Sequence, residues 1–419
     1  EPVSWLTFLG GSGADTVGAM IQTTDGGYVV VGQASTTFGS PVTPYASGVD
    51  IAVVKLDRNG NRVWNTFAGG TGTDIAFGVT QTLDGNIVVT GSSDVTFGSP
   101  VAAYAGGATP DIITLKFDRF GNRLWHTYLG GASNDSGQSV AATADGGAIV
   151  NGPGATTFGS PIVAFAGGTD FAIIKYDING NRVWNTFLGG AGSQDGYSVS
   201  VVPGGDILVS GVTNGTFGTP VTAYAGGQDL VVARYDANGN LIWLTFAGSA
   251  GNDFPGKGSA TSNGGYILIG HSDATWGTPV APYISVVDLV MVQFNSSGGR
   301  VWNTFLGGAS GSEIAGHIVQ RADGSYCGTG MGPVTIGAPL HGYTGANDIL
   351  IFGLNSTGAL LWTTFFGGTG NDQGNHVVAS DDGGCAVAGV AASTFGSPVS
   401  PYTGGNDFAI VKLFANGTL

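Results

Sequence analysis

The sequence has few charged residues, few cysteines and no long apolar run, and each shortage excludes a class of protein. Among its 419 residues are 28 acidic and 13 basic ones, which gives a formal net charge of -15. This excess of negative charge argues against nucleic acid or an anionic membrane surface as a partner. Two cysteines are too few for a disulfide framework or a zinc site. No apolar run approaches the roughly 18 residues of a membrane-spanning helix, so membrane insertion is not expected.

Glycine and aromatic residues are abundant instead. The chain has 77 Gly, 22 Phe, 13 Tyr and 8 Trp. This apolar content excludes a disordered chain, and the glycines lack the strict three-residue period of collagen. The chain begins with Glu1, Pro2 and Val3, without Met or a basic-then-apolar leader, which predicts a mature chain from which any targeting segment has been removed. Low charge and abundant Gly, Ser and Thr favour an extracellular or cell-surface location.

An internal repeat determines the expected fold. Seven tryptophans recur 59 to 61 residues apart, so seven units fill the chain. A period of this kind is typical of arrays in which each unit buries its apolar surface against its neighbours. The tryptophans are Trp5, Trp64, Trp125, Trp184, Trp243, Trp302 and Trp362.

Each unit reads as four β-strands. In the second unit we expect strands over 74–82, 86–90, 111–117 and 123–128, joined by turns at 83–85 and 118–122 and by one long loop between the second and third strands. Helix caps and a 3.6-residue period are absent. The third strand is almost continuously apolar, as in 51–54 and 171–174, which indicates that neighbours cover both of its faces.

Seven such units predict an all-β fold, a seven-bladed β-propeller with four-stranded antiparallel blades. A single domain over 1–419 is expected, with blades near 10–68, 69–129, 130–188, 189–247, 248–306, 307–366, and 367–419 plus 1–9. The last repeat lacks its fourth strand, whereas residues 3–8 match the fourth strand at 62–67. The N-terminal strand should therefore complete blade seven and close the ring, which protects the sheet edges.

Segments such as 183–190 (Val-Trp-Asn-Thr-Phe-Leu-Gly-Gly), preceded by the strand at 170–177, resemble the SBBP-type β-propeller repeats of secreted and surface proteins of bacteria and archaea. The resemblance covers the whole chain. It implies a propeller, an exported location and no enzyme activity, and it supplies no catalytic residues.

An acidic residue follows each tryptophan by 10 or 11 positions, in the Gly-rich link before the innermost strand. These carboxylates could ring one mouth of the central channel and bind a hard cation such as Ca²⁺, which takes about six to eight oxygens. Alternatively, each accepts backbone N–H bonds and orders its own link, which is favoured because the ring is wide for one ion. The ring comprises Asp15, Asp74, Asp135, Asp195, Asp253, Glu313 and Asp372.

A second acidic ring opens every third strand. Because it recurs in all seven units, we expect it to bond the long loop to the strand rather than to form an active site. The turn at 57–61 has alternating oxygen-bearing side chains but lacks the bidentate Glu of a calcium loop, so its Asn-Gly pair predicts a hairpin turn. The second ring comprises Asp50, Asp111, Asp170, Asp229, Asp288, Asp348 and Asp407.

The long loops each carry two large side chains, and loops of about 16 residues between strands are uncommon unless packed or functional. They could form seven lectin-like pockets in which sugars stack on tyrosine faces, or the rings could pack into a small core under each loop, which is favoured. In either case these loops form the expected ligand or partner face. The first side chain is Phe38, Phe97, Phe158, Phe217, Trp276, Ile336 or Phe395, and the second is Tyr45, Tyr104, Phe165, Tyr224, Tyr283, Tyr343 or Tyr402.

Catalytic residues are not expected. The five histidines are not spaced as a metal set, and no nucleophile elbow occurs. Departures from the repeat gather in units five and six and could mark an asymmetric site there, although drift at tolerant positions is favoured. The departures are Pro255, Lys257, His271, Trp276, Glu313, His317, Arg321 and His341.

The two cysteines, Cys327 and Cys385, lie on the second strands of neighbouring units. Their positions along the strands point the side chains to opposite faces of the two sheets, so both could face the gap between these units. A disulfide needs Cα atoms less than about 7 Å apart, and two unbonded cysteines are favoured.

These patterns predict a non-enzymatic structural or interaction module outside the cell or on its surface. Its partner is expected to be another protein or a second copy of this chain. A multivalent carbohydrate-binding propeller is the alternative function. Any partner or glycan should contact the long-loop face, because the tight turns on the opposite face offer little apolar area.

Overall fold

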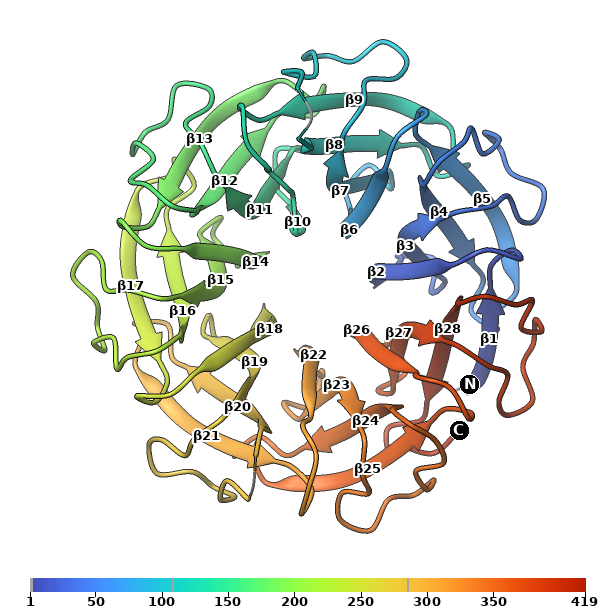
Figure 1. Cartoon of the computed structure of the whole chain (residues 1–419), viewed down its shortest axis with the longest axis vertical. Coiled ribbons are helices and arrows are strands. Elements are labelled where there is room, and N and C mark those ends of the chain that lie inside the picture. The colour runs from blue at the N-terminus through green and yellow to red at the C-terminus, as the bar shows by residue number, and fades with distance from the viewer. Residues whose placement is uncertain (1–2, 108, 285) are drawn as a thin grey trace.

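The computed structural model describes residues 3–107, 109–284 and 286–419, which fold into a ring of antiparallel β-sheets (Figure 1). Glu1 and Pro2, part of the expected mature N-terminus, lie outside the described residues. No helix long or apolar enough to cross a membrane is found in the part of the chain that is described.

Each repeat forms four strands that run from the channel to the outside (Figure 1). We number the units one to seven by their innermost strands, which are β2 (Asp15–Gln22), β6 (Asp74–Gln81), β10 (Ser139–Ala142), β14 (Gln194–Val201), β18 (Asp253–Ala260), β22 (Ile314–Gln320) and β26 (Gln373–Ala379). The second strands are β3 (Tyr28–Ala34), β7 (Ile87–Ser93), β11 (Ala148–Gly154), β15 (Ile207–Thr213), β19 (Tyr266–Ser272), β23 (Tyr326–Gly332) and β27 (Cys385–Ala391).

The third strands are β4 (Asp50–Leu56), β8 (Asp111–Phe117), β12 (Asp170–Tyr176), β16 (Asp229–Tyr235), β20 (Asp288–Phe294), β24 (Asp348–Leu354) and β28 (Asp407–Leu413). The outer strands are β5 (Arg62–Ala68), β9 (Arg123–Leu129), β13 (Arg182–Leu188), β17 (Leu241–Ala247), β21 (Arg300–Leu306), β25 (Leu360–Phe366) and, for the last unit, β1 (Trp5–Leu9). In unit two the bounds differ from the predicted ones by no more than three residues.

Five sheets have four strands, and one has eight in the order β21-β20-β19-β18-β22-β23-β24-β25. The two halves of that sheet meet at a single parallel pair, Lys257 with His317. The fold is a propeller-type repeat in which four-stranded units stand side by side around a channel.

The core lies between neighbouring sheets, as expected from the apolar third strands. Six of the seven third strands are buried at every residue. One cluster joins Val31 and Val53 of unit one to Val89 and Leu115 of unit two. Each unit therefore buries its apolar faces only because the next unit covers them.

The repeated tryptophan links each outer strand to the following unit. Trp64 Nε1 donates to the carbonyl of Arg119 at 3.0 Å, in the turn between β8 and β9. The ring lies beneath Gly121, whose φ is +88° and whose missing Cβ would sit 3.0 Å from it. Trp5 makes the same contact with Arg58 at 2.8 Å. The contact between the indole ring and a turn glycine recurs at all seven tryptophans, and five of them also donate this hydrogen bond, so the period of the sequence reflects packing of each unit on the next.

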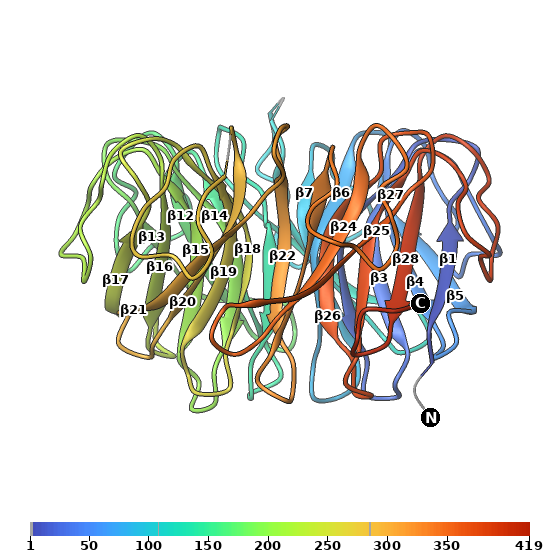
Figure 2. The same cartoon turned by 90° about the horizontal axis from the view of Figure 1, so that it is seen from below.

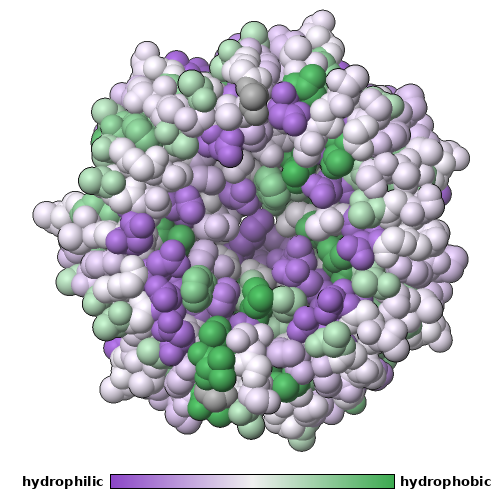
Figure 3. Space-filling view, viewed as in Figure 1, coloured by the Kyte–Doolittle hydropathy of each residue, from purple (hydrophilic) through white to green (hydrophobic). Residues whose placement is uncertain are grey.

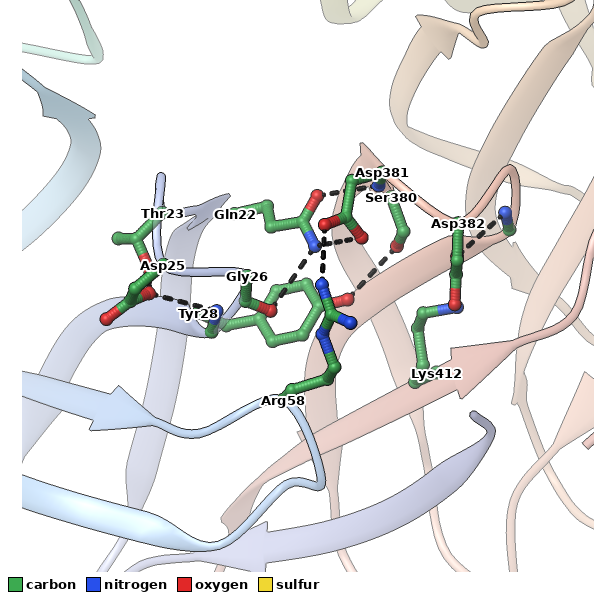
Figure 4. Close-up of polar contacts among 12 residues, drawn as sticks. Gln22, Thr23, Asp25, Gly26, Tyr28, Arg58, Ser380, Asp381, Asp382 and Lys412 are labelled. Atoms are coloured by element: carbon green, nitrogen blue, oxygen red, sulfur yellow. Dashed lines mark hydrogen bonds and ion pairs between the residues drawn. The ribbon is translucent and has the colours of Figure 1, made fainter. Parts of the chain in front are cut away.

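The ring closes between the two ends of the chain. Strand β1 pairs antiparallel with β28, from Trp5 opposite Lys412 to Leu9 opposite Phe408. Units one and seven also meet at their turns, shown in Figure 4, where Gln22 Nε2 and the Arg58 guanidinium both donate to the carboxylate of Asp381, at 3.0 and 2.8 Å. The expected N-terminal completion of the last sheet is confirmed by this pairing.

The long loops leave the face where the links emerge and then run along the outer edge of each sheet (Figure 2). The N–H of Val42 donates to Asn65 O at 2.8 Å, and the N–H of Phe67 donates to Thr43 O at 3.1 Å. Equivalent pairs of bonds recur around the ring. The loops therefore occupy hydrogen-bonding groups that an exposed outer strand would otherwise offer to another chain.

Cys327 on β23 and Cys385 on β27 form a disulfide with Cα atoms 6.6 Å apart. The expectation of two unbonded cysteines is wrong, although their parity did place both side chains in one gap. Both belong to the buried cluster that contains Ile351 and Val387. A cross-link over 58 residues restricts the unfolded chain and joins units six and seven covalently.

Deletion of residues 1–9 should open the ring, because β28 would lose the partner for its outer edge. We expect a lower melting temperature and concentration-dependent aggregation, measured by calorimetry and light scattering. A synthetic peptide of residues 1–12 added in trans should restore part of the loss. An unchanged melting temperature with monodisperse scattering would contradict the closure.

Candidate functional site

The second acidic ring orders the long loops. Asp50 Oδ2 accepts the N–H of Ala46 at 2.6 Å, and Asp170 Oδ2 accepts that of Ala166 at 2.6 Å. The other members accept the corresponding N–H in the same way. The expected structural role of this ring is confirmed in every unit. The turn at 57–61 is likewise a hairpin turn, in which Asp57 Oδ1 accepts the N–H groups of Asn59 and Asn61.

The first acidic ring orders the links between units. Asp135 accepts the N–H of Gly131 at 2.8 Å and of Ala155 at 2.9 Å. Asp15, Asp74, Asp253, Glu313 and Asp372 accept the N–H of their own links. The structure does not bring these side chains together, and among the described residues no three His, Cys, Asp or Glu are grouped to hold a metal ion.

A glycine separates the two acidic rings. A Cβ on Gly248 would lie 2.7 Å from both Asp229 Oδ1 and Asp253 Oδ2. Contacts this short leave room only for glycine between the two carboxylates. The close approach to two acids therefore requires glycine at the first position of the link, whereas the second position carries Ser249 in this unit.

Unit four departs from this pattern at its first acidic position. Gln194 Oε1 accepts the N–H of Gly190 at 2.9 Å, and its amide nitrogen lies 3.4 Å from Thr213 Oγ1. A neutral amide thus orders this link, and the predicted ring member Asp195 stands one position further along β14. The signal was present in the sequence, because Gln194 is the residue 10 positions after Trp184.

Burial perturbs the titration of these acids. It raises the pKa of Asp15, Asp74 and Asp135 to about 6, and that of Glu313 to about 7. The neighbouring carboxylate of the second ring raises it further, as Asp50 does for Asp74. Relative to the unfolded chain, the fold therefore stabilises the neutral form of these acids.

Buried lysines have the opposite effect on acids at the turns between first and second strands. Burial alone would raise the pKa of Asp25, but hydrogen bonds from Lys55 and Thr23 outweigh it and lower the pKa to about 2. Asp84 and Asp145 have a pKa of about 2 for the same reasons.

The aromatic residues of the long loops pack against the outer strands. Phe38 and Tyr45 both contact the ring of Phe67 edge to face, at 5.2 and 5.9 Å between centroids. The hydroxyl of Tyr45 donates within its own loop, to Ser35 O and Gly48 O. The same arrangement holds Phe217, Tyr224 and their equivalents. This geometry agrees with the packing interpretation, and the role of these loops as a partner face stays a prediction.

The central channel is crossed by Lys257 of β18. Its Nζ donates to Phe77 O at 2.9 Å and to Gln138 O at 3.2 Å, on strand β6 and before strand β10. His317 lies beside it, with its ring centroid 4.0 Å from that of His376. Cavities of about 210 and 270 Å³ share Lys257 and Phe77 as lining residues.

Burial also perturbs the titration of this channel cluster. Burial lowers the pKa of Lys257 to about 8 and that of His317 to about 3, and the charge of Lys257 lowers the latter further. Two of the departures predicted for units five and six thus meet in the channel. The others are scattered: His271 stacks on Phe254, and Trp276 donates to Asp253.

A larger pocket, of about 670 Å³, lies among units two, three and four on the long-loop face. This is the face seen in Figure 3, where hydrophilic residues gather around the central opening. We call it the Pro153 pocket. It is lined by Phe77, Ser92, Thr109, Pro110, Ala132, Ser133, Asn134, Asp135, Ser136, Pro153, Ala155, Thr169 and Asp195.

A proline explains why the sheet is irregular there. The N–H of Ser136 donates to Pro153 O at 3.2 Å, but Pro153 has no N–H to return the second bond of the pair. Strand β10 accordingly covers only Ser139–Ala142, whereas the other inner strands have seven or eight residues. Sequence reasoning looked for asymmetry in units five and six and did not use this proline.

No family model matches the chain, so the resemblance to SBBP-type repeats stays a prediction. The regulatory protein FlaEY of Caulobacter vibrioides is 25% identical over 381 residues, which cover 80% of this chain and 38% of that protein. An uncharacterized WD repeat-containing protein of Acanthamoeba polyphaga mimivirus is 24% identical over 176 residues, covering 32% and 12%. The chain spans well under half the length of both relatives.

Among solved structures, the WD40 domain of Neurospora crassa Pan2 is similar, with a TM-score of 0.48, 11% identity and coverage of 97% of this chain and 92% of that one. YCF48 bound to D1 peptide gives a TM-score of 0.42 and 9% identity, with coverage of 98% and 97%. The description of the fold rests on the strand pairing given above.

The acids of the first ring should make stability depend on pH. A carboxyl whose pKa rises from 3.8 to about 6 on folding stabilises the fold fully below the unfolded value, and this contribution is lost as the pH rises through 6. An acid whose pKa falls to about 2 on folding, such as Asp25, stabilises the fold fully above its unfolded pKa of 3.8. This stabilisation is lost as the pH falls through 2. Burial lowers the pKa of His271 to about 4 and that of His317 to about 3. Both histidines therefore destabilise the fold as the pH falls below their unfolded pKa of 6.5, because the unfolded chain binds protons more readily.

Because the raised carboxyls outnumber these histidines, we expect the melting temperature to rise from pH 8 to 5 and to fall below about pH 3.5. Asp74→Asn should raise the melting temperature at pH 8 and flatten this slope, since Gln194 shows that an amide can order the link. Asp236→Asn, at an exposed turn on the opposite face, is the charge-matched control. An unaltered slope in Asp74→Asn would refute the assignment.

Chelation tests the calcium interpretation of the first ring. Because each carboxylate already accepts bonds from its own link or stands apart from the others, excess EDTA should leave the melting temperature unchanged. A reproducible decrease that is restored by Ca²⁺ would show that an ion is bound.

Proposed function

We propose that this chain is a seven-bladed propeller that serves as a protein-interaction module and carries no enzymatic activity. Counting the two halves of the eight-stranded sheet as separate blades supports seven. The partner is another protein, and it contacts the long-loop face. A second copy of this chain is the alternative occupant.

The observation that carries the proposal is the Pro153 pocket. The features that recur in the units are accounted for by packing: the tryptophans hold turns, the acids order links and loops, and the loop aromatics form small cores. The pocket breaks this repetition: it is a hollow in which eight polar residues converge beside five apolar ones, and convergent polar groups in a concave site give orientation and specificity to a ligand.

Other functions have less support. A glycan would need free aromatic faces, but the loop tyrosines use their rings and hydroxyls within the loops. An enzyme would need reactive groups free to meet a substrate, but Lys257 Nζ and His317 Nδ1 are bonded to backbone carbonyls within the channel.

An exported location is part of the proposal. The disulfide between Cys327 and Cys385 supports an oxidising compartment, since disulfides persist mainly outside the cytosol. Low charge and the resemblance to secreted repeats agree with it.

Site-specific photo-crosslinking tests the function. A photoreactive side chain is placed at Ser133, beside the pocket, or at Asn179, in a turn on the opposite face, and each protein is exposed to extracts of its source cells. We expect a discrete protein adduct only from position 133, and its absence in a variant with Asn134→Arg, which fills the pocket mouth. Adducts from position 179 alone, or glycan-only capture, would overturn the proposal.

A further inference from the structure

We propose that the Pro153 pocket binds a lysine or arginine side chain of the protein partner, with the Asp195 carboxylate as its counter-ion. This inference rests on the proposed function and specifies the chemistry of the same site. It is carried by the position of Asp195, by the walls around it and by the absence of a competing cation.

Asp195 differs from the other acids at the links. Gln194 orders the link in its place, and within 3–107, 109–284 and 286–419 no hydrogen bond or ion pair engages the half-buried Asp195 carboxylate, which lines the pocket. The equivalent positions in the other units carry no charge: they are Thr16, Ile75, Ser136, Phe254, Ile314 and Gln373. A carboxylate placed once in seven units, in a pocket and without a structural partner, is free to serve a ligand.

The walls fit the stem of a long cationic side chain. Phe77, Pro110 and Pro153 supply apolar surface against which methylene groups can pack. Ser133 and Asn134 also line the pocket, and their side-chain oxygens can accept a bond from an ammonium or guanidinium group. The pocket thus offers both the apolar channel and the acceptors that such a side chain needs.

The charge around the pocket selects a cation. The described lining residues include no Lys or Arg, and burial raises the pKa of Asp195, which a bound cation would lower again. The net charge of -15 attracts basic partners over a distance. A metal ion is a poorer occupant, because Asp135, the other acid in the pocket, already accepts two backbone bonds.

The test titrates the whole chain with N-acetyl-arginine amide and N-acetyl-lysine amide, with N-acetyl-citrulline amide as a neutral shape match for arginine. Binding is followed by two-dimensional NMR. We expect saturable shifts at the pocket residues with both cations, weaker at high salt, and affinity for citrulline at least about tenfold lower.

Asp195→Asn should reduce the affinity for the arginine probe about tenfold or more while leaving the melting temperature close to that of the parent. Asp236→Asn, which removes the same charge from the opposite face, should leave the affinity unchanged. The proposal is overturned if citrulline binds as well as arginine, if Asp195→Asn binds normally, or if the shifts arise elsewhere.

The two proposals fail separately. Protein adducts from position 133 without binding of the cationic probes would retain the interaction module and remove the cationic ligand. Probe binding that depends on Asp195, without any protein adduct, would retain the cation site and remove the protein partner.

Discussion

Every unit of this ring depends on a contact that it cannot make by itself: the tryptophan of one outer strand must find the turn of the next unit. Each indole lies under a turn glycine with positive φ, as Trp64 does at Gly121, and five of the seven also donate to a carbonyl of that turn. The buried clusters likewise join neighbouring sheets. Because these contacts run around the ring, the last unit must pack against the first. The pairing of β1 with β28 completes the last sheet, so that the apolar faces of both units are covered.

Most of this architecture follows from the sequence, because one period repeated seven times averages out local ambiguity. The strand order, the closure by the N-terminal segment and the structural role of the second acidic ring were predicted from recurrence. Glycines with positive φ fix the turns, and the apolar third strands must be buried. Together these features restrict how neighbouring strands can pair within each unit. What repeats is what every unit needs for packing, and packing obeys general rules.

What occurs once was harder to predict. Parity placed Cys327 and Cys385 in one gap, but the distance between two backbones depends on sheet stacking that no pattern encodes. Asp195 was assigned to the ring because it is acidic, although Gln194 has the geometry to order the link. Pro153 interrupts the sheet through the one ladder bond that it cannot make, and the pocket that it lines is a property of three units together.

The lysine that crosses the channel has a mechanical consequence. Most contacts in the ring join neighbouring sheets. Lys257 instead links unit five to units two and three across the channel, because it donates hydrogen bonds to the carbonyls of Phe77 and Gln138. The side chain of Phe77 forms one wall of the Pro153 pocket. The backbone that carries this wall is therefore held from the opposite side of the ring. A wall fixed in advance lowers the conformational entropy that binding of a ligand would cost.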